Sequence, residues 1–146
     1  MYDIRQQEMA LSQNMGSAVS ALSTHPTEQY LLATACTNGV VNLWDERNLN
    51  RPLHAFLGHS KPVTRIEWNF FTPSIFATCG GDQRVCIWNV EWIGREQSER
   101  EQVEGPPELM FVHGGHQKRV NDISWNPTVR FYIINYSTYV LKWRYT

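Results

Sequence analysis

The side chains best suited to metal chemistry in this chain are two cysteines, Cys79 and Cys86, and two histidines, His113 and His116. The cysteines are predicted to lie across a hairpin from each other, and neither pair has the spacing of a zinc site. A reduced cysteine in an apolar strand behaves as a small hydrophobic side chain. We therefore predict buried structural roles for these residues and no bound metal.

Catalytic groups are equally scarce. An enzyme needs a nucleophile with its base, a glycine loop that binds phosphate, or paired carboxylates in a pocket. The glycine pair Gly80-Gly81 lies in a predicted turn, and Gly114-Gly115 runs directly into a histidine. The sequence therefore predicts a protein that is not an enzyme and that uses no cofactor.

A repeated pattern positions most of the tryptophans. Three times a turn residue stands six places before a tryptophan, and the three pairs are Asn38 and Trp44, Asp82 and Trp88, and Ser137 and Trp143. Two Gly-His pairs, Gly58-His59 and Gly115-His116, each lead into an alternating run that ends in Trp-Asn. The distance from Trp44 to Trp88 falls within the 40–45 residues, roughly, that a four-stranded propeller blade occupies.

Each repeat divides into short apolar or alternating runs separated by turns, which is the pattern of β-strands. The predicted strands are residues 19–23, 30–36, 40–44, 53–57, 62–68, 75–79, 84–90, 108–113, 120–125, 132–135 and 139–144. Two segments, 4–15 and 95–103, have weak helical periodicity, and any helix in them is expected to be short and uncapped. Five of the six tryptophans close a predicted strand, and Trp92 has no such position.

Charge and composition exclude several classes of function. The formal net charge is -1, and the lysines and arginines are scattered, so direct binding to nucleic acid is not expected. No run is apolar and long enough to span a bilayer, and the N-terminus lacks the apolar core of a signal peptide. Three cysteines, an odd number, favour a reducing, intracellular compartment.

The spacing of the Gly-His, Asp and Trp residues resembles that of WD-repeat propellers, from Tyr2 to Trp143. The resemblance implies an all-β fold, a partial WD-repeat β-propeller of about three blades from a seven-bladed ring. Residues 1–14 would be the tail of a preceding blade and a linker, 15–57 a blade, 58–113 a blade with a polar insert at 95–107, and 114–146 an incomplete last blade. The remainder of the propeller or another chain would be needed to cover the open edges.

The same resemblance implies a buried network that links a turn His, a strand Ser or Thr, a turn Asp and a Trp. In the second blade these residues are His59, Thr78, Asp82 and Trp88. Burial favours such a network, because an imidazole and a carboxylate inside a stack of sheets must satisfy each other's hydrogen bonds.

The other two blades depart from this pattern. The first has Met15 at the place of the His and Asn38 at the place of the Asp. Both ionisable members of the pair are therefore replaced together, and no buried charge lacks its partner. The third keeps His116 but places Ile133 and Ser137 opposite it. We therefore expect the third blade to be the least rigid.

A longer match surrounds the insert. Residues 93–98, Ile-Gly-Arg-Glu-Gln-Ser, and 105–116, Gly-Pro-Pro-Glu-Leu-Met-Phe-Val-His-Gly-Gly-His, are similar to the histone-binding WD-repeat family, the retinoblastoma-binding and Msi-like chromatin subunits. That resemblance implies that the insert and an N-terminal helix together clamp a histone helix. The implied contacts are the carboxylates Glu101 and Glu104, the rigid loop residues Pro106 and Pro107, and an apolar floor of Phe111 and Val112.

The function implied by this resemblance is a non-enzymatic scaffold, a histone-binding subunit of chromatin assembly or modifying complexes. Its partners would be a histone helix and other subunits of such complexes, in the nucleus or also in the cytoplasm. Two alternatives stay open. One is the glutamate-rich WD-repeat branch linked to ribosome assembly, suggested by Pro62-Val63-Thr64 and Glu67-Trp68, although a longer acidic insert is expected there. The other is a truncated copy without independent activity.

Overall fold

The computed structural model describes residues 16–129, 132–137 and 140–144, which contain three antiparallel β-sheets. The first sheet has the strand order β1 (Val19–Thr24), β2 (Leu31–Cys36), β3 (Val40–Asp45) and β4 (His54–Leu57). The second has the order β5 (Val63–Trp68), β6 (Ile75–Gly80), β7 (Val85–Asn89) and β8 (Leu109–His113). The third consists of β9 (Asp122–Trp125), β10 (Tyr132–Tyr136) and β11 (Val140–Arg144), in that order.

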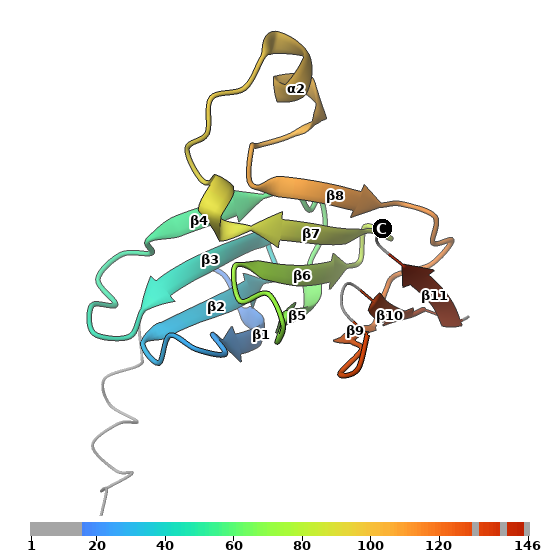
Figure 1. Ribbon diagram of the computed structural model, residues 1–146, viewed down its shortest axis with the longest axis horizontal. Helices are drawn as coiled ribbons and strands as arrows, with labels where there is room; N and C mark the ends of the chain where they lie inside the picture. The colour runs from blue at the N-terminus through green and yellow to red at the C-terminus, as the bar shows by residue number, and fades with distance from the viewer. Residues whose placement is uncertain (1–15, 130–131, 138–139, 145–146) are drawn as a thin grey trace, which may run out of the picture.

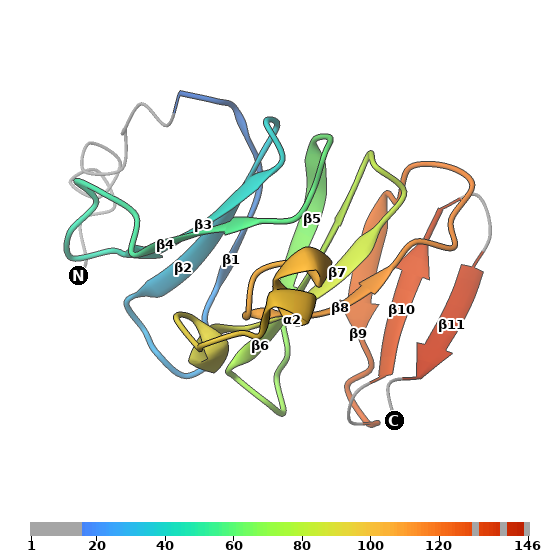
Figure 2. The ribbon, with the colours of Figure 1, turned by 90° about the horizontal axis from the view of Figure 1, so that it is seen from above.

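The three sheets stand side by side (Figures 1 and 2). Strand β1 contacts β5, and β5 contacts β9, so the first strands of successive sheets are neighbours. Each sheet is a meander in which consecutive strands pair, and repeated meanders stacked in this way are the blades of a β-propeller. The prediction of an all-β, propeller-type fold is confirmed.

The central strands are the most deeply buried because each is covered on both faces. All six residues of β6 are buried, as are all five residues of β7. Such strands are expected to read as continuous apolar runs, whereas the first strand of a sheet alternates. Because continuous apolar runs and alternating runs are both local patterns, the bounds of the strands can be predicted from the sequence.

Two apolar cores lie between the sheets. The core between the first and second sheets contains the rings of Phe56, Phe76 and Trp88, and the Phe56 ring centroid is 4.9 Å from that of Phe76 and 5.4 Å from that of Trp88. The core between the second and third sheets contains Ile87 and Ile123. Aromatic side chains dominate the first of these interfaces, and each buries a large area.

Regularly spaced hydrogen bonds also connect neighbouring sheets. Trp68 Nε1 donates to the carbonyl oxygen of Ser23 at 3.2 Å, and Trp125 Nε1 donates to that of Glu67 at 3.0 Å. Near the other end of the first strands, the Thr64 hydroxyl oxygen lies 2.6 Å from the carbonyl oxygen of Val120. The tryptophans that end these strands therefore pack and also hold one sheet to the next.

The prediction of an uncapped helix in the insert is wrong. Its helix, α2 (Glu99–Glu104), is capped, because Ser98 and Glu101 form a capping box in which each side chain bonds to the other's backbone N–H. The pattern Ser-x-x-Glu is the signal for this cap, and it is present in the sequence. The other helical candidate, 4–15, and the predicted blade tail within 1–14 lie outside the described residues.

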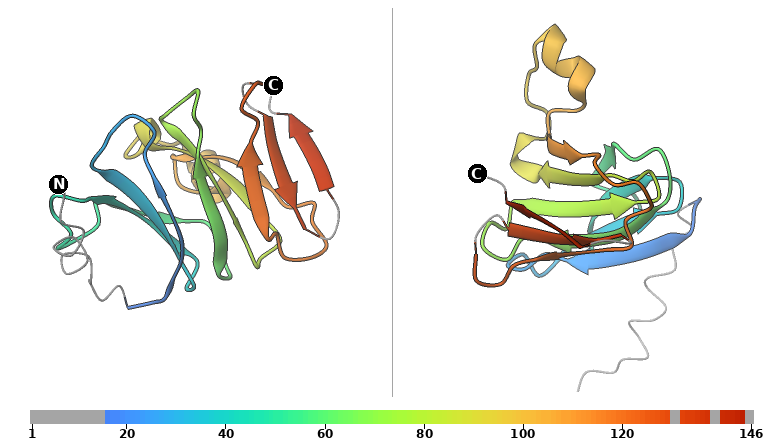
Figure 3. Two further views of the ribbon diagram at one scale, coloured as in Figure 1. Left: turned by 90° about the horizontal axis from the view of Figure 1, so that it is seen from below. Right: turned by 90° about the vertical axis from the view of Figure 1, so that its right-hand side faces the viewer.

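The insert stands away from the sheets. Figure 1 shows α2 beyond β8, and the right-hand view of Figure 3 shows it projecting from the edge of the second sheet. No residue of α2 is buried. Among the described residues, no helix combines the length and apolar character needed to cross a membrane.

Candidate functional site

The structure contains a buried chain of hydrogen bonds in the second sheet. His59 Nδ1 lies 3.0 Å from both carboxylate oxygens of Asp82, and His59 Nε2 lies 2.8 Å from Thr78 Oγ1. Trp88 Nε1 donates to the same Thr78 oxygen at 2.8 Å. Asp82 also accepts the backbone N–H of Ser60 at 3.1 Å. The four residues therefore join β6, β7 and the segment that leads into the sheet.

One arrangement of hydrogens satisfies every donor in this network. Neutral His59 donates from Nδ1 to Asp82 and accepts the Thr78 hydroxyl hydrogen at Nε2, which leaves the Thr78 oxygen to accept from Trp88. Burial lowers the pKa of His59, while its bond to Asp82 opposes that shift. The two carboxylate oxygens and the ring are thus fully used in holding the fold, and this network is not available to a ligand.

The third sheet has only part of this arrangement. His116 Nδ1 lies 3.3 Å from the Ser137 hydroxyl oxygen, and Ile133 is buried. The His113 ring meets the His116 ring edge to face with centroids 5.2 Å apart. Across the residues that the structure describes, no three His, Cys, Asp or Glu side chains come together as a metal site.

The buried cysteines are poorly suited to react. Burial raises the pKa of Cys79 to about 11 and that of Cys86 to about 12. The thiolate is the reactive form of cysteine, so a raised pKa makes both thiols inert near neutral pH.

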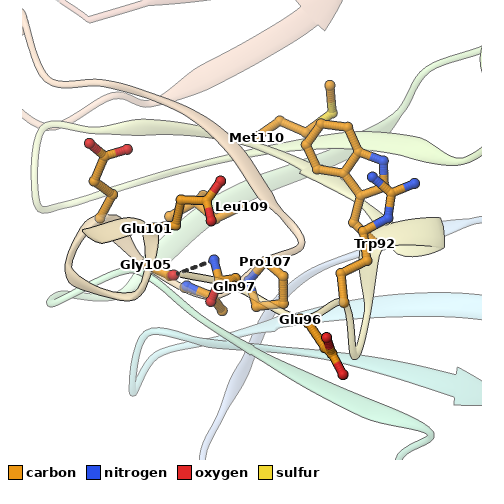
Figure 4. A pocket seen from close by; sticks show the side chains of 11 residues that line it. Trp92, Glu96, Gln97, Glu101, Gly105, Pro107, Leu109 and Met110 are labelled. Carbon is orange, nitrogen blue, oxygen red and sulfur yellow. Dashed lines mark hydrogen bonds between the residues drawn. The ribbon is translucent and has the colours of Figure 1, made fainter. Parts of the chain in front are cut away.

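The second candidate site is a pocket of about 430 Å³ beneath the insert. We call it the insert pocket. It is lined by Trp92, Arg95, Glu96, Gln97, Glu101, Glu104, Gly105, Pro106, Pro107, Leu109 and Met110. Figure 4 shows Glu101 at one side of the pocket and Trp92 at the other, with Leu109 and Pro107 between them. The volume is in the range of sites that bind several side chains or a small ligand.

Local interactions shape the insert. Gln97 Nε2 donates to the Gly105 carbonyl oxygen at 3.1 Å, so the two ends of the loop around α2 are tied together. Gly105 ends α2 with a φ of 140°, and an added Cβ would lie 2.8 Å from Leu109 Cδ2. A glycine is therefore required where the chain leaves the helix and enters the proline pair.

The residues predicted for histone contact fall into two groups. Four of them, Glu101, Glu104, Pro106 and Pro107, line the insert pocket. Phe111 and Val112 do not line it. They are successive residues of β8, and Val112 packs on the core between the first and second sheets while Phe111 packs on the core between the second and third. Alternation along a strand separates them, so they do not form one surface.

Two of the three carboxylates in α2, Glu101 and Glu104, line the pocket and have different environments. Glu101 is held by the Ser98 hydroxyl at 2.7 Å and by the Ser98 backbone N–H at 2.8 Å, and these bonds lower its pKa. Glu104 is exposed and occupies the last turn of α2, where the helix has no basic residue. A carboxylate there faces the negative end of the helix dipole, which is unfavourable for the helix itself.

Trp92 and Arg95 are pocket residues that the sequence did not point to. Trp92 lies in the short 3-10 helix η1 (Val90–Trp92), and the Arg95 guanidinium carbon is 4.9 Å from the centroid of its ring. The sequence signal was indirect, since Trp92 was the tryptophan without a strand position. A tryptophan that is not needed for the cores is free to line a site.

A buried carboxylate anchors the far end of the insert. Glu108 follows the proline pair, and its Oε1 lies 2.7 Å from Nε2 of His54 in β4. The Glu108 side chain is 5% exposed and that of His54 is 27% exposed. This contact ties the base of the insert to the neighbouring sheet, so the proline pair is positioned by two sheets rather than one.

Four-stranded meanders with a His–Asp–Thr–Trp network define a WD-repeat protein, and the comparisons agree. The family model described as WD domain, G-beta repeat matches residues 7–45 and 50–89. The chain belongs to the WD-repeat family. Curated relatives extend the similarity into the insert and beyond.

Two of these relatives carry the same name. The Histone acetyltransferase type B subunit 2 of Candida glabrata is 33% identical over 133 residues, which are 91% of this chain and 32% of that protein. The protein of that name from Debaryomyces hansenii is 34% identical over 116 residues, 75% of this chain and 28% of that protein. The resemblance to histone-binding WD-repeat proteins is thereby confirmed, and the chain spans about a third of the length of these relatives.

Proposed function

We propose that this chain is part of a non-enzymatic scaffold that binds a basic helical segment of a histone at the insert pocket. The observation that carries the proposal is the position of Glu101 and Glu104 on the wall of a pocket, next to a rigid proline pair. The similarity to proteins named as histone acetyltransferase subunits supports a histone as the partner.

The unfavourable position of Glu104 strengthens this proposal. A carboxylate in the last turn of a short exposed helix costs stability unless a cation compensates it. A lysine or arginine of a bound segment would supply that cation, and the proline pair would hold the loop without a further loss of entropy on binding. Among the described carboxylates and bases, no ion pair involves Glu104.

The wider role follows from the same partner. A propeller that binds a histone without catalytic groups would present it to other subunits of a chromatin assembly or modifying complex. We propose a nuclear location for such a complex. Blade faces that the described sheets leave uncovered would be completed by further propeller or by another chain.

Binding to purified core histones tests the proposal. The affinity of the chain for each core histone would be measured by fluorescence anisotropy at two salt concentrations. We expect Glu104→Lys to weaken binding by roughly 1–3 kcal/mol, because a favourable charge pair becomes a repulsive one. Glu99→Lys is the matched control, since Glu99 lies on the same helix but does not line the pocket. Equal effects of the two changes would contradict the pocket as the binding site.

A further inference from the structure

The insert pocket has a cationic end as well as an acidic one. The Arg95 guanidinium stacks on Trp92, with its carbon 4.9 Å from the ring centroid. Stacking uses the flat face of the guanidinium and leaves the N–H groups at its edge available for hydrogen bonds. In the described part of the chain no carboxylate comes within ion-pair distance of it.

This isolation is notable because three carboxylates share the pocket with Arg95. Glu96, Glu101 and Glu104 all line it. Glu101 is turned to Ser98 by the capping box, and Figure 4 places it across the pocket from Trp92. The stacking contact with Trp92 therefore holds the guanidinium apart from Glu101.

A surface arginine on a tryptophan could be purely structural. Exposed cation–π pairs stabilise a fold by about 0.5–1 kcal/mol. Here, however, the pair borders a pocket, and η1, which carries Trp92, has no buried residue. Neither side chain is needed to fill a core, so the pair is available to a partner.

We propose that Arg95 binds a side-chain carboxylate of the partner segment, while Glu101 and Glu104 receive its basic side chains. This inference rests on the proposed function of the same pocket. A guanidinium edge matches a carboxylate with two parallel hydrogen bonds. The three glutamates that line the pocket repel a doubly charged phosphate more strongly than a singly charged carboxylate, which favours Asp or Glu as the ligand.

The two charged ends fix the direction of the bound segment. A segment that presents bases toward Glu101 and an acid toward Trp92 fits in one orientation, and the reversed segment meets like charges at both ends. The pocket thus selects partners by the order of their charges and not only by their net positive charge.

The experiment uses the full chain and overlapping 20-residue peptides that tile the core histones, with affinities measured by fluorescence anisotropy. We expect Arg95→Gln to weaken binding of the tightest peptide roughly three- to tenfold, and Arg95→Glu to weaken it further. Arg100→Glu, an equal change on the exposed α2 helix outside the pocket lining, should have little effect.

A double-mutant cycle identifies the carboxylate. Changing one acidic residue of the peptide to Gln should cost as much as Arg95→Gln, and the two changes together should cost little more than either alone. Changing that acid to Lys should restore part of the affinity for the Arg95→Glu protein.

The possible failures are distinct. If Glu104→Lys abolishes binding while Arg95→Glu does not change it, this inference is wrong and the proposed function stands. If Arg95 matters but no acidic peptide residue couples to it, the carboxylate ligand is ruled out. If no core histone or peptide binds at all, both proposals fail.

Discussion

The first and second sheets share half of a hydrogen-bonded network and differ in the other half. Trp44 Nε1 donates to Thr34 Oγ1 at 2.9 Å, just as Trp88 donates to Thr78 at 2.8 Å. Of these two sheets, only the second extends the series of hydrogen bonds from its threonine through His59 to Asp82. In the first sheet Asn38 stands at the aspartate position, and its Oδ1 accepts the N–H of Val40 two residues on.

The difference separates two structural tasks. The Trp–Thr bond lies within one sheet and fixes the tryptophan on its neighbouring strand. The His–Asp bond joins that sheet to the segment by which the chain arrives from the previous sheet. A blade therefore forms without the charged half, and that half secures its entry segment.

Removing the carboxylate should give the largest effect. Asp82→Ala leaves the buried His59 donor and the Ser60 N–H without their acceptor, and we expect a loss of roughly 3 kcal/mol or more in the free energy of unfolding. Asn38→Ala removes one exposed local bond and should cost about 0.5–1 kcal/mol. Urea unfolding of both variants checks the comparison, and similar losses would show that the two sheets are equivalent.

Crowding the second tryptophan should come next. A Cβ added to Gly58 would lie 2.6 Å from Cη2 of Trp88, so the ring or the entry segment must move. We expect Gly58→Ala to cost roughly 2–3 kcal/mol. The control is Gly114→Ala, because a Cβ there meets nothing within 4 Å. An unchanged unfolding midpoint for Gly58→Ala would mean that the entry segment is not fixed against the network.

The shared half can be compared directly. Thr34→Val removes the acceptor of Trp44 and should cost about 1 kcal/mol. Thr78→Val leaves Trp88 Nε1 without its acceptor and His59 Nε2 without its donor, and should cost about 2 kcal/mol. Both threonines are buried, so the two changes are well matched. Equal costs in urea unfolding would indicate that His59 adds nothing to the second sheet.

The smallest effect is a pH dependence that comes from His59, which bonds to the second sheet and has no counterpart in the first. Burial lowers the pKa of folded His59 below its ordinary value of 6.5, so the unfolded chain binds a proton more readily. The stability that neutral His59 contributes is therefore fully present above pH 6.5, and it is lost as the pH falls from 6.5 toward the pKa of His59 in the folded protein.

Unfolding in urea at about pH 7.5 and 5.5 measures this dependence, with the pH difference in stability expected to shrink in His59→Gln. The half-buried His25, whose ring packs on Trp68, provides the control variant, His25→Gln. A pH difference that His59→Gln leaves intact would contradict the assignment. The raised pKa of Glu67 acts with the opposite sign, and it cancels between the wild type and the variant.

Much of the fold was predictable because strand signals are local. Alternation and short apolar runs placed all eleven strands within about two residues of their observed bounds. The cap of α2 was equally local, and Ser98 with Glu101 carried the pattern that predicts it. The opposite directions of Phe111 and Val112 also follow from strand alternation, although the family resemblance grouped them on one floor.

The sequence by itself determined the repeat, the strands and the types of residue that each blade could place in a network. Those features depend on spacing along the chain and on the period of a strand. Tertiary structure decided which residues meet: His59 with Asp82, His54 with Glu108, and the far walls of the insert pocket. Such contacts depend on how the sheets stack and where the loop folds back, and no local pattern encodes the distance between Trp92 and Glu101.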